Sequence, residues 1–121
     1  MPGFTFPKTC HIRKEADFDR AYKTRIFAAD DVLVVNGAAN GLTHARLGLS
    51  VSRKVGNAVV RNQWKRRIRE AFRLSQEQLP AGLDLVVRPQ KGAKLDFQAI
   101  LASLPALSQR ISHRISHMGK G

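Results

Sequence analysis

The sequence is poor in cysteine, in acidic residues and in long apolar runs. Its single cysteine, Cys10, excludes an internal disulfide and is typical of a reducing compartment. No run approaches the ~18 apolar residues that a membrane-spanning helix needs, because the longest, Val32–Val35 and Leu85–Val87, have the length of strands. Residues 1–8 lack the apolar stretch of a secretory signal. We therefore expect a cytoplasmic protein with no membrane partner.

The shortage of acids leaves a large positive charge. Lys and Arg total 21 against 9 Asp and Glu, a formal net charge of +12, and such self-repulsion points to a polyanionic partner. Hydrophobic residues make up 43% of the 121 residues, enough for one folded domain over 1–121 and too few residues for two. We expect its ends, 1–10 and 112–121, to be flexible.

Apolar periodicity and turn residues divide the chain into six elements. We predict helices and strands in the order 15–24 (helix), 31–36 (strand), 45–52 (strand), 57–77 (helix), 83–88 (strand) and 96–117 (helix). The Asn-Gly in 37–44 indicates a turn that would join the first two strands as a hairpin. Pro105 should kink or shorten the last helix. The pattern indicates a mixed α+β fold with helices packed on a small sheet, with room for one more strand.

The segment Arg53–Arg73 carries the strongest functional signal, with eight basic residues and one acid. Asn57 suits the N-cap of its helix. One stripe of the helix is apolar and comprises Val60, Trp64, Ile68, Ala71 and Phe72. The opposite stripe carries cations at four-residue spacing, Arg61, Lys65, Arg69 and Arg73, with Asn62 and Arg66 beside them. Each pair of like charges at this spacing destabilises an isolated helix by roughly a few tenths of a kcal/mol. A bound polyanion would remove this repulsion.

A basic amphipathic helix is often only a solvated surface or a membrane-surface helix. Three features favour RNA here. The outer face is nearly all of one sign, Arg outnumbers Lys and offers a planar fork for phosphates and bases, and Asn62 lies within the face. Gly56 before the helix would also let backbone amides approach a phosphate.

The motif KVGNAVVRN at 54–62, followed by KR at 65–66 and RE at 69–70, resembles the signature of the bacterial ribonuclease P protein family. ADFDRAYK, GLSVSRK and LDLVVR resemble its first helix, its second strand and its last strand, so the resemblance covers roughly residues 10–105. One departure is Gln63, where the family's Arg-Asn-Arg type of motif has a third cation.

The resemblance implies a fold and a role. The fold would be an α-β-β-β-α-β-α two-layer sandwich like domain 2 of ribosomal protein S5, with a left-handed βαβ crossover against the usual right-handed rule. The role would be to assist a catalytic RNA, with Mg²⁺ bound mainly by that RNA, in removing the 5′ leader from precursor tRNA. The implied partners are the catalytic RNA and the leader, with no obligate protein partner.

Site residues follow from the resemblance by position. The face that docks the catalytic RNA would comprise Arg53, Lys54, Asn57, Arg61, Asn62, Lys65, Arg66, Arg67 and Arg69. The cleft that holds the single-stranded leader would comprise Phe18, Tyr22, Ser50, Ser52 and Arg88. Without the resemblance, Phe18 and Tyr22 would be read as core residues. Val35 would stand where some members have a third aromatic on the first strand, which would weaken stacking of the leader.

No protein active site is evident in the sequence. Cys10 and His11 are adjacent in the N-terminal arm, a poor geometry for a catalytic dyad, and Asp30-Asp31 is read as the start of a strand. His113 and His117 have a spacing that can bind metal, but no third ligand is evident. We therefore predict no catalytic residues and no metal ligands in this chain.

Three other functions stay open. A ribosomal protein or a general RNA chaperone could share the fold and the charge, and a self-sufficient protein nuclease would cut RNA without an RNA subunit. A DNA-binding function is weaker, because no helix-turn-helix pair is apparent. Stimulation of leader removal at low Mg²⁺ separates the ribonuclease P subunit from these alternatives.

Overall fold

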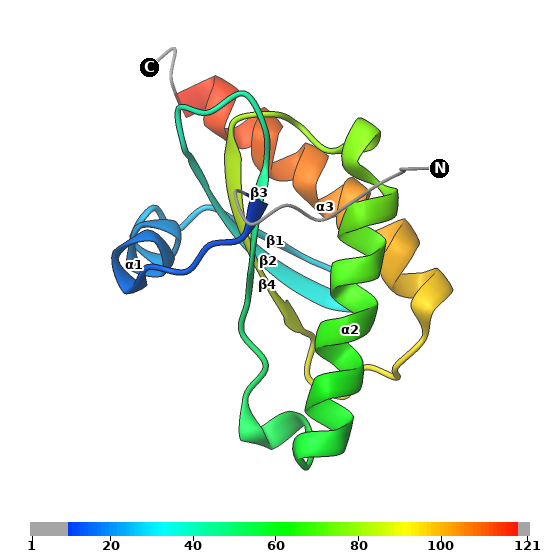
Figure 1. Ribbon diagram of the computed structural model, residues 1–121. Coiled ribbons are helices and arrows are strands. Elements are labelled where there is room, and N and C mark those ends of the chain that lie inside the picture. Colours follow the sequence, from blue (N-terminus) through cyan, green and yellow to red (C-terminus); the bar gives the residue numbers. More distant parts are fainter. Residues whose placement is uncertain (1–9, 119–121) are drawn as a thin grey trace.

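The computed structural model describes residues 10–118, which fold around one four-stranded sheet (Figure 1). The elements follow the order α-β-β-β-α-β-α, as the resemblance implies: α1 (Glu15–Lys23), β1 (Phe27–Ala29), β2 (Leu33–Ala39), β3 (Arg46–Leu49), α2 (Ala58–Leu74), β4 (Leu83–Pro89) and α3 (Phe97–Met118). The α+β fold class is thus confirmed. Residues 112–118, part of the segment expected to be flexible, belong to α3. The other flexible stretches predicted, 1–9 and 119–121, lie outside the described residues.

The sheet has the strand order β1-β2-β4-β3. β2 pairs with β1 and with β4 antiparallel, and β3 pairs with β4 parallel, so β3, α2 and β4 form a βαβ unit. The handedness of this crossover and the likeness to ribosomal protein S5 stay predictions. The predicted hairpin of 31–36 with 45–52 is wrong, because β4 lies between these strands. In β4, the side chains of Leu85, Val86 and Val87 are at most 1% exposed, and a strand that is apolar on both faces is typical of the centre of a sheet.

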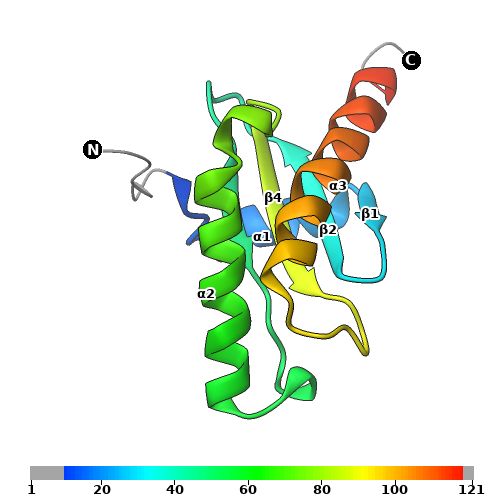
Figure 2. The ribbon, with the colours of Figure 1, turned by 90° about the vertical axis from the view of Figure 1, so that its right-hand side faces the viewer.

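Helices α2 and α3 pack side by side on one face of the sheet, called here the inner face, and α1 lies against the opposite, outer face (Figures 1 and 2). The inner-face core joins alternate residues of the strands with the apolar stripes of α2 and α3. Its largest fully buried side chains include Leu33, Leu47, Ile68, Phe72, Leu85, Ile100, Leu104, Leu107 and Ile111.

Pro105 does not shorten the last helix, since α3 continues from Phe97 to Met118, whereas the alternative of a kink stays a prediction. A proline inside a helix loses one backbone hydrogen bond and costs about 3 kcal/mol. Here the neighbouring side chains Leu104 and Leu107, each at most 1% exposed, are held in the inner-face core. Tertiary packing of this apolar stripe therefore outweighs the local preference of proline.

The outer face has a much smaller apolar cluster, so α1 needs a second attachment. Ile12, Ala21 and Val86 are buried there, with Phe18 and Tyr22 packed against them. Next to this cluster, the fully buried carboxylate of Asp84 accepts hydrogen bonds from Arg46 at 2.6 and 2.7 Å and from Arg20 of α1 at 2.8 Å.

Three parts of the chain meet at this carboxylate, because Asn40 from the loop after β2 also donates to it at 3.0 Å. Burial alone would raise the pKa of Asp84, but the hydrogen bonds from Arg46 and Asn40 and the charge of Arg46 lower the pKa below its usual value. A carboxyl whose folded pKa is lowered stabilises the fold above its unfolded pKa of about 3.9. That contribution disappears as the pH falls through the folded pKa.

We predict that Asp84→Asn lowers the free energy of unfolding by about 1.5–3 kcal/mol at pH 7, because it removes the buried carboxylate that accepts from Arg46 and from the more exposed Arg20 and leaves the partly solvated Asp17 as their counter-charge. Urea denaturation measures this loss. The control is Asp17→Asn, because Asp17 lies at 3.4–3.5 Å from the same arginines, is partly solvated and should cost under about 1 kcal/mol. The stability of Asp84→Asn should also fall less on acidification below about pH 4. Equal losses for both variants would contradict the role assigned to Asp84.

Candidate nucleic-acid interface

Helix α2 begins at a cap that the sequence predicts. The Asn57 Oδ1 accepts a hydrogen bond from the Val60 amide at 3.0 Å. The preceding Gly56 lies so close to the helix that a Cβ there would be 2.9 Å from the Val60 side chain. Glycine therefore lets the chain turn tightly from the short 3₁₀ helix Arg53–Val55 into α2. This turn brings Arg53 and Lys54, both exposed, next to the first turn of α2.

The apolar stripe of α2 is buried as predicted, with Trp64, Ile68, Ala71 and Phe72 at most 2% exposed. The cations of the helix keep to its other sides: Arg66, Arg67 and Arg69 are exposed, Arg61 and Lys65 are half-buried. An ion pair on this helix joins Arg73 to Glu70 at 2.6 Å. The buried Arg61 Nε has no hydrogen-bond partner in the described part of the chain. The remaining charge is available to an external polyanion.

The cations of α2 fall on two sides of the helix. Lys65 and Arg69 line a hollow of about 200 Å³ together with Phe18 of α1 and Leu47 and Leu49 of β3. Arg67 lies on the other side, beside the start of α3, in a depression with Lys94, Leu95 and Phe97. Lys65 and Arg69, two members of the row Arg61, Lys65 and Arg69, thus border the edge strand β3, and beyond that edge lies the outer face of the sheet.

The positive potential of this hollow acts on a neighbouring titratable group. His11 lines the hollow, and the pKa of its imidazole is lowered by partial burial and by the charges of Arg13 and Arg69. Burial and these two charges thus both disfavour the protonated form of His11.

The five residues predicted for the leader cleft all lie toward the outer face of the sheet. Phe18 covers Gly48 of β3, and Tyr22 packs beside it on the Val86 cluster. Ser50 follows β3 and donates its backbone N–H to the Val87 carbonyl, which places it beside Arg88 of β4. The alternation predicted within 45–52 is confirmed over Arg46–Leu49, whereas Ser50 and Ser52 lie after the end of the strand.

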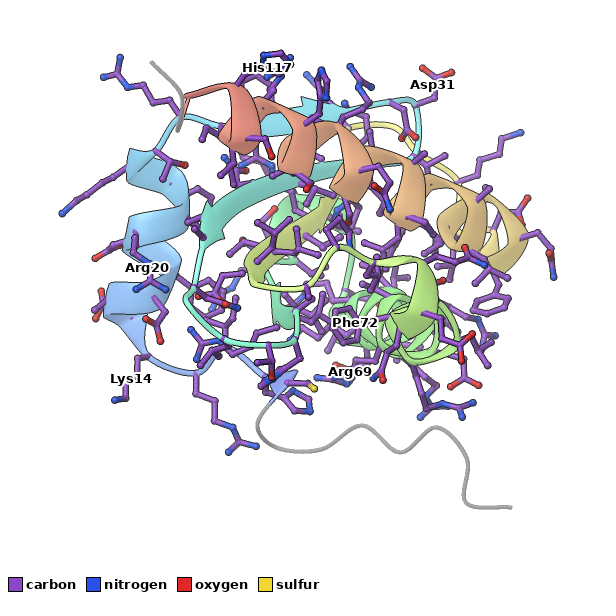
Figure 3. The ribbon with its side chains drawn as sticks, turned by 90° about the horizontal axis from the view of Figure 1, so that it is seen from above. Lys14, Arg20, Asp31, Arg69, Phe72 and His117 are labelled. Carbon is purple, nitrogen blue, oxygen red and sulfur yellow. The ribbon has the colours of Figure 1, made fainter. Side chains whose placement is uncertain are left out.

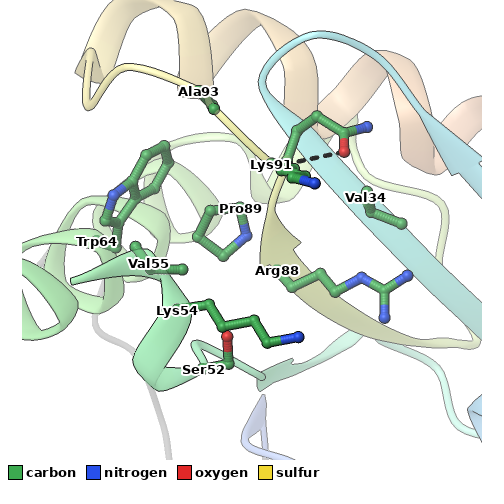
Figure 4. Close-up of a pocket in the computed structure, with 11 residues that line it drawn as sticks. Val34, Ser52, Lys54, Val55, Trp64, Arg88, Pro89, Lys91 and Ala93 are labelled. Atoms are coloured by element: carbon green, nitrogen blue, oxygen red, sulfur yellow. Dashed lines mark hydrogen bonds between the residues drawn. The ribbon is translucent and has the colours of Figure 1, made fainter.

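A larger hollow, of about 580 Å³, opens at the end of the outer face (Figure 4). Its walls include Ser52, Arg88, Lys54 and Lys91, so residues from both predicted sets meet in it. Trp64 closes its inner side at 2% exposure and belongs to the core, as expected. The arrangement offers three cations and a hydroxyl around a space that a nucleotide phosphate could enter.

The prediction that Val35 takes the place of a third aromatic residue in the leader cleft is wrong. Val35 is 0% exposed and points into the inner-face core. The outer face instead carries Phe27 on β1, which is 49% exposed and pairs in register with Asn36. Asn36 pairs in turn with Val86, and Val86 with Gly48, so one row crosses the sheet from Phe27 to the ring of Phe18. The Oδ1 of Asn36 is buried without a hydrogen-bond partner among residues 10–118.

The sequence analysis misses Phe27 because β1 is only three residues long and shows no detectable periodicity. The signal that could find it is the Asp30 turn. The Asp30 Oδ1 accepts hydrogen bonds from the Val32 and Leu33 amides at 2.8 and 2.9 Å, which closes a short hairpin between β1 and β2. Burial raises the pKa of Asp30, but the Ser103 hydroxyl and these amides together lower it by more, so the net pKa lies below its usual value.

The described residues contain no cluster of three or more His, Cys, Asp or Glu that could hold a metal ion. Four carboxylates are engaged with protein donors: Asp84 and Asp17 with arginines, Asp30 with Ser103, and Glu70 with Arg73. No helix within residues 10–118 combines the length and apolar character needed to cross a bilayer.

Comparisons with known proteins point to one family. The sequence profile described as Ribonuclease P matches residues 6–112. The ribonuclease P protein component of Desulfovibrio desulfuricans is 38% identical, over 95% of this chain and 92% of the relative. The structure of the Thermotoga maritima RNase P protein matches with a TM-score of 0.76 at 34% identity, covering 83% of this chain and 96% of that one. The Staphylococcus aureus RNase P protein gives a TM-score of 0.72 at 39% identity, covering 83% and 93%.

We predict that Gly48→Ala displaces the Phe18 ring, because the new Cβ would lie 2.8 Å from Phe18 Cε1. Overpacking of this kind costs about 1–3 kcal/mol. The smaller side chain in Phe18→Leu should relieve the clash, so the double variant should be more stable than the sum of the single losses by at least about 0.5 kcal/mol. Denaturant unfolding of the four proteins measures this coupling. Gly48→Ala combined with the remote Leu74→Ala should be additive, and additivity in both pairs would refute the contact.

Proposed function

The chain belongs to the ribonuclease P protein family and is a subunit of that endoribonuclease, and we propose that it binds both the catalytic RNA and the 5′ leader of precursor tRNA. The observation that carries this proposal is the meeting of two surfaces at β3. The cation row of α2 and the Phe18 side of the outer face share one hollow through Lys65, Arg69 and Phe18. A single RNA assembly could contact both surfaces without a gap.

The α2 face is suited to a folded RNA. Arg61, Lys65 and Arg69 repeat along the helix at intervals of about 6 Å, close to the spacing of phosphates along a strand. Arg66, Arg67, Arg53 and Lys54 extend the charge around the start and outer side of the helix, and Asn62 adds an amide that can bond sugar or base groups. We assign this face to the catalytic RNA.

The outer face is suited to a single strand. It carries aromatic rings at two ends of one sheet row, Phe18 at β3 and Phe27 at β1. Between them, Asn36 and Val86 are at most 8% exposed because α1 packs on this face, and the buried Asn36 Oδ1 has no hydrogen-bond partner among residues 10–118. Stacking of a base on such a ring contributes about 1–3 kcal/mol. Arg88 and Ser52, at the end of this face, would hold a phosphate of the same strand. We assign this face to the leader.

In this proposal the hydrolysis is carried by the RNA subunit and its Mg²⁺, in the cytoplasm where precursor tRNA is processed. The protein places the leader and neutralises phosphates, so that fewer metal ions are needed to bring two RNAs together.

The general RNA chaperone and the self-sufficient nuclease make different predictions. A chaperone would bind RNA through α2 without stimulating leader removal by the catalytic RNA. A protein nuclease would cut precursor tRNA after all RNA has been removed from the preparation. The cleavage assay below distinguishes these functions.

We predict that the chain stimulates precursor-tRNA cleavage by its catalytic RNA at low Mg²⁺, and that the triple change Arg61→Ala, Lys65→Ala and Arg69→Ala removes most of this effect. Affinity for the catalytic RNA should fall, and the slope of log affinity against log salt should decrease by about 0.7–0.9 for each phosphate that the variant no longer neutralises. Filter binding across a salt series measures both quantities.

The charge-matched control changes three exposed cations outside α2, Lys23, Lys94 and Arg110, to Ala. It removes the same net charge, so a general polyanion effect would weaken both triple variants alike. Equal weakening would contradict the docking face, and failure of the folded wild type to stimulate cleavage would contradict the function itself.

We predict that Phe27→Ala weakens binding of precursor tRNA by about 5-fold to 100-fold because base stacking is removed, with no change for mature tRNA, which lacks a leader. Phe27 is half-exposed, so its removal should leave the stability of the fold within about 0.5 kcal/mol. Binding of the holoenzyme to the two RNAs measures the effect. Leu42→Ala removes a similarly exposed apolar side chain from a loop and is the matched control. A loss of affinity shared by mature tRNA would exclude a leader contact at Phe27.

A further inference from the structure

A pair of histidines lies at the C-terminal end of α3, on the other side of the molecule from Arg69 (Figure 3). His113 and His117 are one helical turn apart, and both side chains are exposed. Their Nε2 atoms face each other at 2.9 Å, with the ring centroids 4.2 Å apart and the ring planes at 67°. This pair belongs to neither of the surfaces assigned to RNA.

The distance between the two nitrogens fits a metal ion held by both. Imidazole nitrogens bind divalent transition metals at about 2.0–2.1 Å. Two such bonds at a right angle place the nitrogens about 2.9 Å apart, whereas the tetrahedral angle of Zn²⁺ requires about 3.3 Å. Right angles between neighbouring ligands are typical of Cu²⁺ and Ni²⁺ sites. The two rings therefore already have the arrangement of adjacent ligands in a square-planar or octahedral complex.

We propose that His113 and His117 form a two-histidine site for Ni²⁺ or Cu²⁺. Without metal, one neutral ring donates its Nε2 proton to the other ring; with metal, that ring carries its proton on Nδ1, so both Nε2 lone pairs reach the ion. The described residues offer no cluster of three protein ligands, so water completes the coordination shell.

The surroundings of the pair select for this class of ion. The adjoining hollow, of about 480 Å³, is also lined by Thr24, Ile26, Arg25 and Arg114. Two arginines repel cations, and no carboxylate lines the hollow, so Mg²⁺ and Ca²⁺, which require oxygen ligands, are excluded. Arg114 donates to the Phe27 carbonyl at 2.7 Å, which holds its charge toward β1. Only an ion with a strong preference for imidazole overcomes the remaining repulsion.

The test is titration of the untagged full-length chain with NiCl₂, followed by calorimetry and by the shift of its thermal unfolding. The wild type should bind one Ni²⁺ at this site and unfold at a higher temperature with the ion. His113→Ala and His117→Ala should each weaken binding by at least about tenfold, since even partners outside the ligand set contribute that much.

The matched control exchanges two neighbours, Ser112→His with His113→Ser. It keeps the composition and the number of histidines but places the two rings five residues apart, on different sides of the helix. Circular dichroism should show an unchanged helix, and Ni²⁺ binding should fall as in the alanine variants. Equal binding by the exchanged variant and the wild type would overturn the proposal, as would a wild type that binds no Ni²⁺ at millimolar concentration.

Discussion

Strand β4 is buried on both of its faces, and most of the structure depends on that constraint. Leu85 and Val87 join the inner-face core, while Val86 and Asp84 point the other way and are equally buried. A strand of this kind needs a hydrogen-bonded partner on each side and a covering helix on each face. β4 therefore lies between β2 and β3, and the chain must cross over through α2 to make β3 and β4 parallel. That crossover carries the cation row of α2 along the β3 edge.

The charged side chains discussed above form two groups, one on the outer face of the sheet beside β4 and one on α2. On the outer face, Asp84 and Asp17 neutralise Arg20 and Arg46, so these arginines attach α1 to the sheet. On α2, Glu70 pairs with Arg73, and the cations before it lack such partners within residues 10–118. The acids of these ion pairs thus serve the fold, and two of the α2 cations, Lys65 and Arg69, lie where the helix, the β3 edge and the outer face meet. A net charge of +12 gives a long-range attraction for RNA, and this distribution gives it direction.

The sequence predicts the parts of this arrangement that depend on local pattern. The apolar stripe and cationic face of α2, the Asn57 cap and the alternation of β3 are all present, because each is set by the period of one element. Strand pairing is different, since it depends on which strands can be buried together, and the hairpin predicted for β2 and β3 is wrong for that reason. The sequence analysis does not identify Phe27 as an outer-face residue, because a strand of three residues is too short to show a period. Val35 points inward because its register is set by β4, through pairing with Val87.

The apolar cluster on the outer face is small, so the attachment of α1 to the sheet also depends on Gly48 and Asp84. Ala21 is the buried residue of α1, so apolar burial alone holds this helix weakly. Asp84 fixes its charged side through Arg20, and the absence of a side chain at Gly48 lets the Phe18 ring approach β3 closely. One of these contacts is ionic and the other steric, and together they set the distance between Phe18 and the sheet. The width of any cleft on this face therefore depends on Asp84 and Gly48, two residues of the sheet itself.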